Sequence, residues 1–195
     1  MIMRRIWIVL FCTSLVSFII VFRLFVCEIY IVDSPSMLPT IQPTEICLVD
    51  KWSGGALLPR RFADIPILNI FTWVKPLRKW DNLNDWGFHR LSAHREYMKG
   101  DVILFKAKDD NKILVKRIES IHYAKDCTYY YVLGDNVTNS TDSRHFGLIP
   151  DSVVIGRTNC IVFSWDEYAS GLKKIRWWRL GQTISKSKSY VSMEK

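Results

Sequence analysis

Three short segments of the chain combine residue types that could cleave a covalent bond. The first, Ser34-Pro35-Ser36, places two hydroxyl groups in a proline-rich turn. A serine in such a turn most often only stabilises the turn. It becomes a nucleophile when a base lies beside it and takes its proton. The chemistry of this segment therefore depends on whether another part of the chain supplies a base.

The second segment, residues 114–118, supplies a candidate base. If it forms a strand, its side chains alternate, so Lys116 leaves the same face as the apolar Leu114 and Ile118. Burial disfavours an ammonium group and can lower the pKa of a lysine by several units, which leaves a neutral amine able to accept a proton near neutral pH. The alternative is a lysine at the edge of a sheet with its ammonium in water.

The third segment, residues 134–144, follows an aromatic run at 129–133 and is rich in hydroxyl, amide and carboxylate groups. Such a loop can be an Asx-type turn with no further role. It can also hold oriented polar groups that brace an active site. The candidates for that role are Asp135, Ser140, Asp142 and Arg144.

Other catalytic systems have less support. The histidines at 89, 94, 122 and 145 lie in no GxSxG elbow, so a Ser-His-Asp site is not expected. The five cysteines form no CxxC pair, and the sequence predicts neither a metal site nor a cofactor. A disulfide between Cys127 and Cys160 is left open.

The first element that could position these segments is the apolar run at 6–26, which is long enough to span a bilayer as a helix. Arg4 and Arg5 precede it, and by the positive-inside rule they keep the N-terminus in the cytoplasm. A cleavable signal peptide is the competing interpretation. Residues 23–29 offer no pair of small residues for cleavage, so an uncleaved anchor is expected.

After the anchor, runs of β-branched and aromatic residues are bounded by Gly, Pro, Asp and Asn. They predict a mainly β, antiparallel sheet domain. The expected strands are Ile29–Val32, Ile46–Val49, Val102–Lys106, Ile113–Ile118, Tyr129–Leu133 and Val153–Phe163.

The segment 52–98 differs from the rest, because tryptophans alternate there with basic residues and prolines interrupt regular structure. It is either a long covering loop that contributes tryptophans to the core, or a surface that rests on anionic lipid headgroups. The basic end, 167–195, poses the same choice. A frayed terminus is expected beyond 183.

Composition limits the class of protein. With 195 residues, 49% hydrophobic and 24% charged, the chain is neither disordered nor fibrous. The net charge is +8, and the excess of basic residues lies in the first 27 residues, in residues 51–99 and after 166, while 100–166 is nearly neutral. The expected plan is a start and anchor at 1–27, a β-rich domain at 28–166 and a basic tail at 167–195. The expected polyanionic partner is membrane phospholipid and not nucleic acid.

Four segments resemble, in order and content, the conserved boxes of type I signal peptidases. They are Ser34–Thr40, Gly100–Phe105, Val115–Ile118 and Gly134–Arg144. The resemblance departs from the family at Pro35 and Val137, where a glycine and a basic residue are usual. The few residues between Lys116 and Gly134 leave no room for the accessory β-domain of larger relatives.

The resemblance implies a membrane-anchored β-sheet peptidase with a Ser/Lys pair. Ser36 would be the nucleophile and Lys116 the neutral general base. The hydroxyl of Ser34 and the backbone N–H of Ser36 would form the oxyanion hole. Ser140 would orient the lysine amine, and two carboxylates would pair with two arginines to brace the site. These supporting residues are Asp135, Asp142, Arg117 and Arg144.

The implied activity is removal of signal peptides from exported precursor proteins. The implied location is the inner membrane, in a single pass, with the catalytic domain on the outer, periplasmic face. Two alternatives remain. The chain could be a catalytically silent anchored β-module that binds exported proteins. It could also be a Ser/Lys self-cleaving peptidase of the SOS-repressor kind, although those proteins lack a membrane segment such as 6–26.

Overall fold

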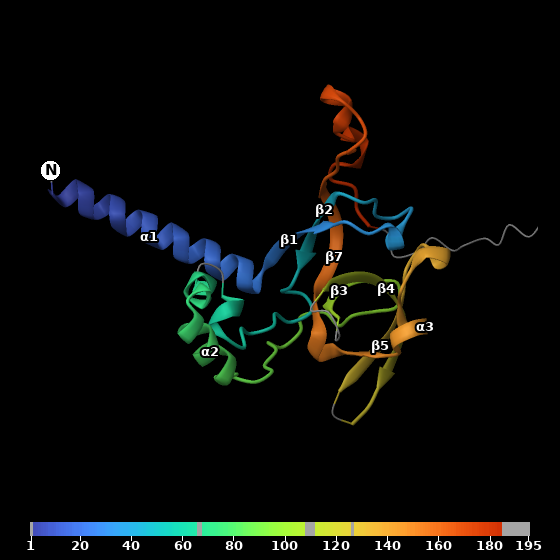
Figure 1. Cartoon of the computed structure of the whole chain (residues 1–195), viewed down its shortest axis with the longest axis horizontal. Helices are drawn as coiled ribbons and strands as arrows, with labels where there is room; N and C mark the ends of the chain where they lie inside the picture. The colour runs from blue at the N-terminus through green and yellow to red at the C-terminus, as the bar shows by residue number, and fades with distance from the viewer. Residues whose placement is uncertain (1, 66–67, 108–111, 126, 185–195) are drawn as a thin grey trace, which may run out of the picture.

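The computed structural model describes residues 2–65, 68–107, 112–125 and 127–184. Part of the expected frayed terminus, from 185 onward, lies outside them. The first element is helix α1, Ile2–Phe25, which extends away from the rest of the chain (Figure 1). Its stretch Met3–Phe25 has a mean hydropathy of 2.5, and none of it is buried against the protein. By length and composition this helix can cross a membrane.

A seven-stranded antiparallel sheet forms the body of the chain, in the order β1-β2-β7-β3-β4-β5-β6. The expected mainly antiparallel β architecture is therefore confirmed. Each expected strand lies within one or two residues of an observed one, except that β4 continues five residues further and β6 was not expected. The strands are β1 Cys27–Val32, β2 Glu45–Asp50, β3 Val102–Lys106, β4 Ile113–Tyr123, β5 Thr128–Leu133, β6 Ile149–Pro150 and β7 Val154–Phe163.

The core lies around the central strand β3, which pairs with β7 on one side and β4 on the other. Its residues Val102 to Phe105 are all buried. One apolar cluster joins β3 to β4, β5 and β7 through side chains that include Phe105, Ile118 and Val132. A second joins β1, β2 and β7 to the segment after β1, which contributes Met37 and Ile41. The segment that carries Ser36 is thus packed into the core on its apolar side.

The insertion between β2 and β3 is more regular than its prolines suggest. It contains two short 3₁₀ helices, η2 Phe62–Asp64 and η3 Leu68–Trp73, and helix α2, Lys75–Leu83. Pro76 lies in the first turn of α2, where a missing N–H costs no helical hydrogen bond. The buried carboxylate of Asp81 accepts hydrogen bonds from the backbone N–H groups of Phe62 and Ala63 at 2.8 and 3.2 Å.

The four tryptophans of this insertion do not enter the core. Their exposed fractions are 57% for Trp52, 76% for Trp73, 53% for Trp80 and 45% for Trp86. The interpretation of the segment as a covering loop that supplies core tryptophans is therefore wrong. Aromatic contacts are local, since Phe62 stacks on Trp80 and meets the edge of Trp86.

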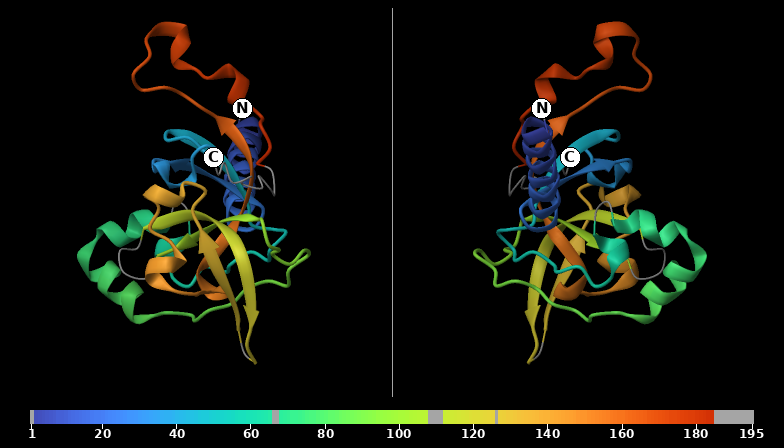
Figure 2. Two further views of the ribbon diagram at one scale, coloured as in Figure 1. Left: turned by 90° about the vertical axis from the view of Figure 1, so that its right-hand side faces the viewer. Right: turned by 90° about the vertical axis from the view of Figure 1, so that its left-hand side faces the viewer.

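The segment after β7 folds back on the sheet. This segment contains two short 3₁₀ helices, η6 Gly171–Lys174 and η7 Trp177–Arg179. The N–H of Gly181 donates to the carbonyl of Ile161 at 2.9 Å, and the N–H of Ile161 donates to the carbonyl of Gln182 at 3.0 Å. Residues 181–184 therefore pair with β7, while the stretch between the end of β7 and this return projects from the sheet (Figure 2). All five cysteines are free thiols.

Candidate active site

Ser36 lies in the 3₁₀ helix η1, Pro35–Met37, directly after strand β1. Ser34 caps this helix, because its Oγ accepts a hydrogen bond from the backbone N–H of Ser36 at 3.3 Å. Asn136 holds the same turn from the other side. Its backbone N–H donates to the carbonyl of Ser36 at 3.0 Å, and its side-chain amide donates to the carbonyl of Pro35 at 3.1 Å. The serine turn is thus fixed by the third motif, and Asn136 is a residue that sequence reasoning did not single out.

Lys116 reaches Ser36 from the centre of the sheet. On β4 it pairs with Ile103 of β3, and its side chain leaves the buried face as the alternation predicts. The residue is 2% exposed, and its Nζ lies 2.6 Å from the Oγ of Ser36. The two residues, 80 positions apart in sequence, are therefore in hydrogen-bond contact.

Burial controls the charge of this lysine. Desolvation lowers the pKa of Lys116 to about 8; the charges of Asp142 and Asp135 oppose the shift, and that of Arg144 assists it slightly. An amine with this pKa is neutral in about a tenth of the molecules at pH 7. The pair therefore has what nucleophilic catalysis needs, which is a hydroxyl and a proton acceptor at hydrogen-bond distance.

Asp142 accepts most of the hydrogen bonds that hold the third motif together. Its fully buried carboxylate accepts hydrogen bonds from the Gly134 N–H at 3.0 Å and from the Ser140 hydroxyl at 2.8 Å. Arg144 adds two charged donors at 2.8 Å. Burial alone would raise the pKa of Asp142, but these donors hold it well below the usual range for a carboxyl. Ser140 thus lies in the network, but its hydroxyl donates to Asp142 and not to the Lys116 amine that the resemblance assigns to it.

A second ion pair ties all three motifs together. Arg117, the neighbour of Lys116, donates to both carboxylate oxygens of Asp135 at 2.8 and 2.6 Å. It also donates to the carbonyl of Gly100 at 2.8 Å. The hydroxyl of Thr40, at the end of the serine segment, donates to the same carboxylate. The bidentate geometry is the strong form of this interaction and fixes the segments relative to one another.

Gly134 is required by the close approach of these segments. A Cβ atom at this position would lie 2.1 Å from the Ser140 Oγ and 2.6 Å from the Ser36 carbonyl oxygen. The second of these is backbone, which cannot move without displacing the serine turn. This requirement explains why the third motif starts with glycine.

A cleft of about 90 Å³ opens at Ser36. One wall is the end of β1 and the following turn, residues 30–34, and the other is the start of β4, residues 113–115. Leu104 and Ser36 also line it. A groove between two strands with apolar walls suits an extended peptide with small apolar side chains.

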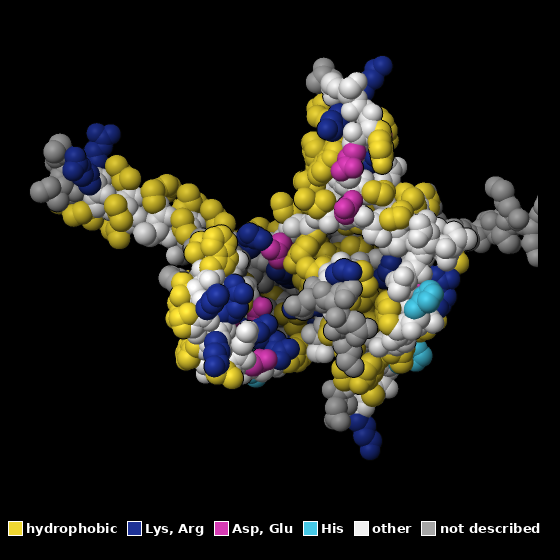
Figure 3. Space-filling model, viewed as in Figure 1, with side chains coloured by type: hydrophobic (Ala, Val, Ile, Leu, Met, Phe, Trp, Pro, Cys, Tyr) yellow, Lys and Arg dark blue, Asp and Glu magenta, His cyan; other side chains and the backbone are white. Residues whose placement is uncertain are grey.

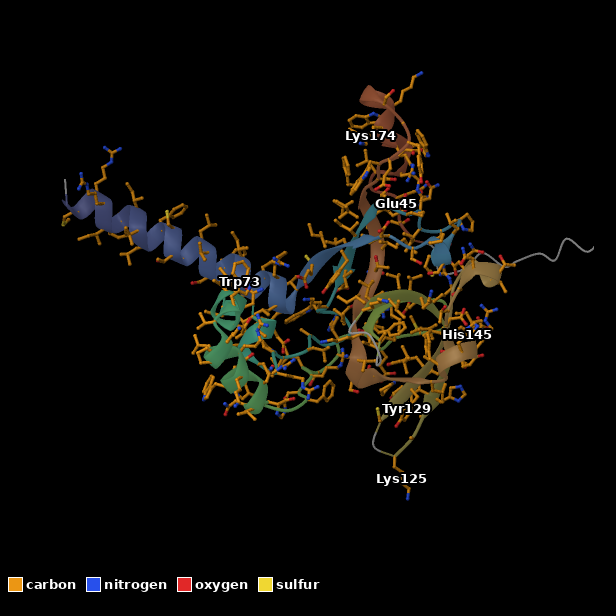
Figure 4. All side chains as sticks on the ribbon, in the orientation of Figure 1. Glu45, Trp73, Lys125, Tyr129, His145 and Lys174 are labelled. Atoms are coloured by element: carbon orange, nitrogen blue, oxygen red, sulfur yellow. The ribbon has the colours of Figure 1, made fainter. Side chains whose placement is uncertain are left out.

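The C-terminal segment supports the serine turn in a way that the sequence did not reveal. Arg179 donates to both carboxylate oxygens of Glu45 at 2.7 and 2.8 Å, and to the carbonyl of Thr40 at 2.8 Å. Glu45, labelled in Figure 4, is the first residue of β2 and is fully buried. The sequence around Arg179 resembles a solvated basic tail, so it does not reveal that this arginine pairs with the buried carboxylate of Glu45.

We expect Arg179→Ala to lower the free energy of unfolding by about 3–5 kcal/mol, because it leaves the buried carboxylate of Glu45 without its charged partner. Denaturation in detergent micelles measures this loss. Arg60→Ala is the matched control, since Arg60 pairs with Asp85 at the surface, where both side chains are exposed, and its loss should cost less than about 1 kcal/mol. Adding Glu45→Gln to Arg179→Ala should restore part of the stability. Equal losses for the two arginines would contradict the assignment.

Comparison with known proteins places these features in one family. The family model described as "Signal peptidase, peptidase S26" matches residues 4–121 and 126–165. Signal peptidase I of Bacillus caldolyticus is 26% identical, over 75% of this chain and 85% of the relative. Signal peptidase I of Buchnera aphidicola subsp. Baizongia pistaciae is 24% identical, over 75% and 72%. That of Pseudomonas aeruginosa is 23% identical, over 76% and 69%.

Proposed function

The chain belongs to the signal peptidase family, peptidase S26, and is a serine endopeptidase that removes signal peptides, and we propose that it does so with Ser36 and Lys116. The observation that carries this assignment is the buried contact of 2.6 Å between the Ser36 Oγ and the Lys116 Nζ. Neither a silent binding module nor a soluble self-cleaving peptidase is favoured, because the family match covers the anchor and the sheet together.

In the proposed mechanism, the neutral amine of Lys116 takes the proton of Ser36 as its oxygen attacks the scissile carbonyl. The resulting lysine ammonium then gives that proton to the leaving amine, and an acyl-enzyme remains on Ser36. Water, deprotonated by the same amine, hydrolyses the ester and frees the serine. Asp142 and Asp135 lie close enough to favour the ammonium that forms at each step.

The oxyanion hole requires a local rearrangement. In the free protein the Ser34 hydroxyl accepts from the Ser36 N–H. When the carbonyl oxygen becomes negative, it can take over this N–H and accept the proton of the Ser34 hydroxyl. Two donors would then meet the developing charge, which is the strongest form of transition-state stabilisation for acyl transfer.

We therefore expect Ser34→Ala to lower kcat by about 10²–10³-fold with little change in KM, since the lost donor acts mainly in the transition state. Steady-state cleavage of a synthetic precursor peptide measures both constants. Ser34→Thr, which keeps a hydroxyl, should retain more activity than the alanine variant. A change confined to KM would show that Ser34 only positions the substrate.

The supporting roles follow from the contacts. We propose that two ion pairs hold the serine turn in place against β4. They are Asp135 with Arg117, and Asp142 with Arg144, the second joined by Ser140. The proposed substrate is the extended end of a signal peptide, bound in the cleft beside β1 with small side chains against its apolar walls. We assign no metal and no cofactor to the reaction.

We further propose that α1 anchors the chain in the phospholipid of the inner membrane in a single pass. Arg4 and Arg5 would keep the N-terminus in the cytoplasm, and the sheet would lie on the outer face. This placement brings Ser36 close to the bilayer, where a signal peptide ends.

The test of the proposed function is cleavage of a signal-peptide-bearing precursor by the purified chain, followed by N-terminal sequencing of the product. A new N-terminus directly after the signal peptide is expected. Cleavage only within the chain itself would instead favour a self-cleaving peptidase, and the absence of any cleavage would favour a binding module.

A further inference from the structure

The insertion between β2 and β3 carries an exposed apolar surface that the catalytic chemistry does not use. We call it the insertion face and define it by six residues of η3, α2 and the residue between them. Trp73 is 76% exposed and Leu83 is 77% exposed, and the other four are between 44% and 54% exposed. The six are Ile70, Trp73, Val74, Leu77, Trp80 and Leu83.

Helix α2 separates apolar from basic side chains. At 100° per residue, Leu77, Trp80 and Leu83 lie on one side of the helix. The bases Lys75, Arg78 and Lys79 lie on the other side and are all exposed. Asp81 points inward to the backbone of η2 and anchors the helix at a fixed orientation. The apolar side is therefore held outward: Trp80 stacks on Phe62 but stays 53% exposed, and Leu77 and Leu83 are 44% and 77% exposed.

The position of the insertion face relative to α1 indicates what covers it. In Figure 1 the insertion lies level with the last turns of α1 along the direction of that helix. Figure 2, seen nearly along α1, shows the insertion well to one side of the helix. In Figure 3 hydrophobic side chains line the side of the insertion toward which α1 extends, with Lys and Arg beside them. Trp73, labelled in Figure 4, lies level with the last turns of α1.

We propose that the insertion face docks on an anionic phospholipid surface, as a second contact with the bilayer that α1 spans. A tryptophan- and leucine-rich face with lysine and arginine on the opposite side is the composition of helices that lie in the membrane interface. Trp favours the headgroup region, and each nearby base is attracted to anionic lipid. The inference rests on the proposed anchor, because a bilayer spanned by α1 sets the position of the membrane surface relative to the insertion face.

Two contacts with one bilayer would restrict the tilt of the sheet. With α1 alone, the sheet could pivot about the segment that joins α1 to β1. A lateral contact at the insertion face would limit that motion and hold the cleft at a constant height above the lipid. The contact would therefore orient the active site toward emerging signal peptides.

Quenching of tryptophan emission by brominated lipid tests the docking on the full chain in vesicles. Three single variants isolate three tryptophans by difference from the parent. Trp73→Leu reports the insertion face, Trp7→Leu reports α1, and Trp178→Leu reports the C-terminal segment, where Trp178 is 71% exposed. We expect the emission assigned to Trp7 and Trp73 to be lost in brominated vesicles and that assigned to Trp178 to persist.

The outcomes separate the docking from the anchor. If Trp7 is quenched and Trp73 is not, the anchor stands and lipid docking is overturned, which leaves the insertion face to a protein partner. If neither is quenched, the proposed anchor fails as well. If Trp178 is quenched as strongly as Trp73, the contact is not specific to the insertion face, and the proposal is overturned.

The role of charge has its own comparison. In vesicles that contain phosphatidylglycerol, quenching of Trp73 should exceed that in phosphatidylcholine alone, and it should weaken in about 1 M salt, where the Debye length is about 3 Å. Lys75→Gln with Lys79→Gln should reduce the difference between the two lipids while leaving cleavage of a soluble peptide unchanged. Equal quenching in both lipids would overturn the requirement for anionic headgroups.

Discussion

A Ser36→Ala variant is expected to lose precursor cleavage by on the order of 10⁶-fold, the loss found when the nucleophile of a serine peptidase is removed. The physical reason is that Lys116 retains its place and pKa but has no hydroxyl to deprotonate. The cavity left by one oxygen is small, so the fold should persist. The measurement is the initial rate of cleavage of a synthetic precursor by purified protein in detergent.

The matched control for this variant is Ser92→Ala, because Ser92 is an exposed serine in the insertion. We expect wild-type turnover from it, and melting temperatures within a few degrees for both variants. Appreciable cleavage by Ser36→Ala would exclude Ser36 as the nucleophile and with it the proposed mechanism.

The second large effect is the pH dependence that Lys116 imposes. Only the neutral amine can accept the serine proton, and the pKa of Lys116 is lowered to about 8. Below this pH the fraction of neutral amine falls tenfold per pH unit, so kcat/KM should rise about tenfold per unit up to pH 8 and then level off. An ordinary lysine, with its pKa near 10.5, would give a profile that still rises above pH 9.

Substitution of the same residue tests the cause of the profile. Lys116→Arg should be inactive at every accessible pH, since a guanidinium stays protonated. Lys116→Met should be equally inactive, yet its melting temperature should not fall, because burying an amine costs stability that a thioether does not. The control is Lys99→Arg, whose exposed side chain pairs with Glu119. Turnover by Lys116→Arg would refute the neutral base.

The strands were predictable because they rest on local patterns, whereas the contact of Ser36 with Lys116 was expected only from the resemblance of their segments to a known family. Alternation around Lys116 correctly placed its side chain on the buried face of β4. The family resemblance predicted that Ser36 and Lys116 come together, and their side chains lie at hydrogen-bond distance, with Asp142 close enough to influence the charge of the lysine. β6 was missed because two residues with a proline carry no periodicity. Prolines in the insertion predicted irregular structure, but Pro76 begins a helix instead.

Other features depended on long-range contacts that a single sequence does not reveal. Arg179 lies in a segment that resembles a solvated tail, and only its distant partner Glu45 shows that it is structural. Asn136 belongs to a polar loop in which every residue could form a turn. Its two hydrogen bonds to the serine turn follow from the docking of that loop against η1, which only the tertiary structure shows.

The wide separation of the reacting groups has a consequence for biosynthesis. The nucleophile is made early, the general base follows 80 residues later, and the arginine that secures the turn comes near the end of the chain. A partly synthesised or partly exported chain therefore holds an ordinary serine with no adjacent amine. The Ser36–Lys116 pair therefore exists only once the sheet has formed, so a chain that is still unfolded has no activated serine.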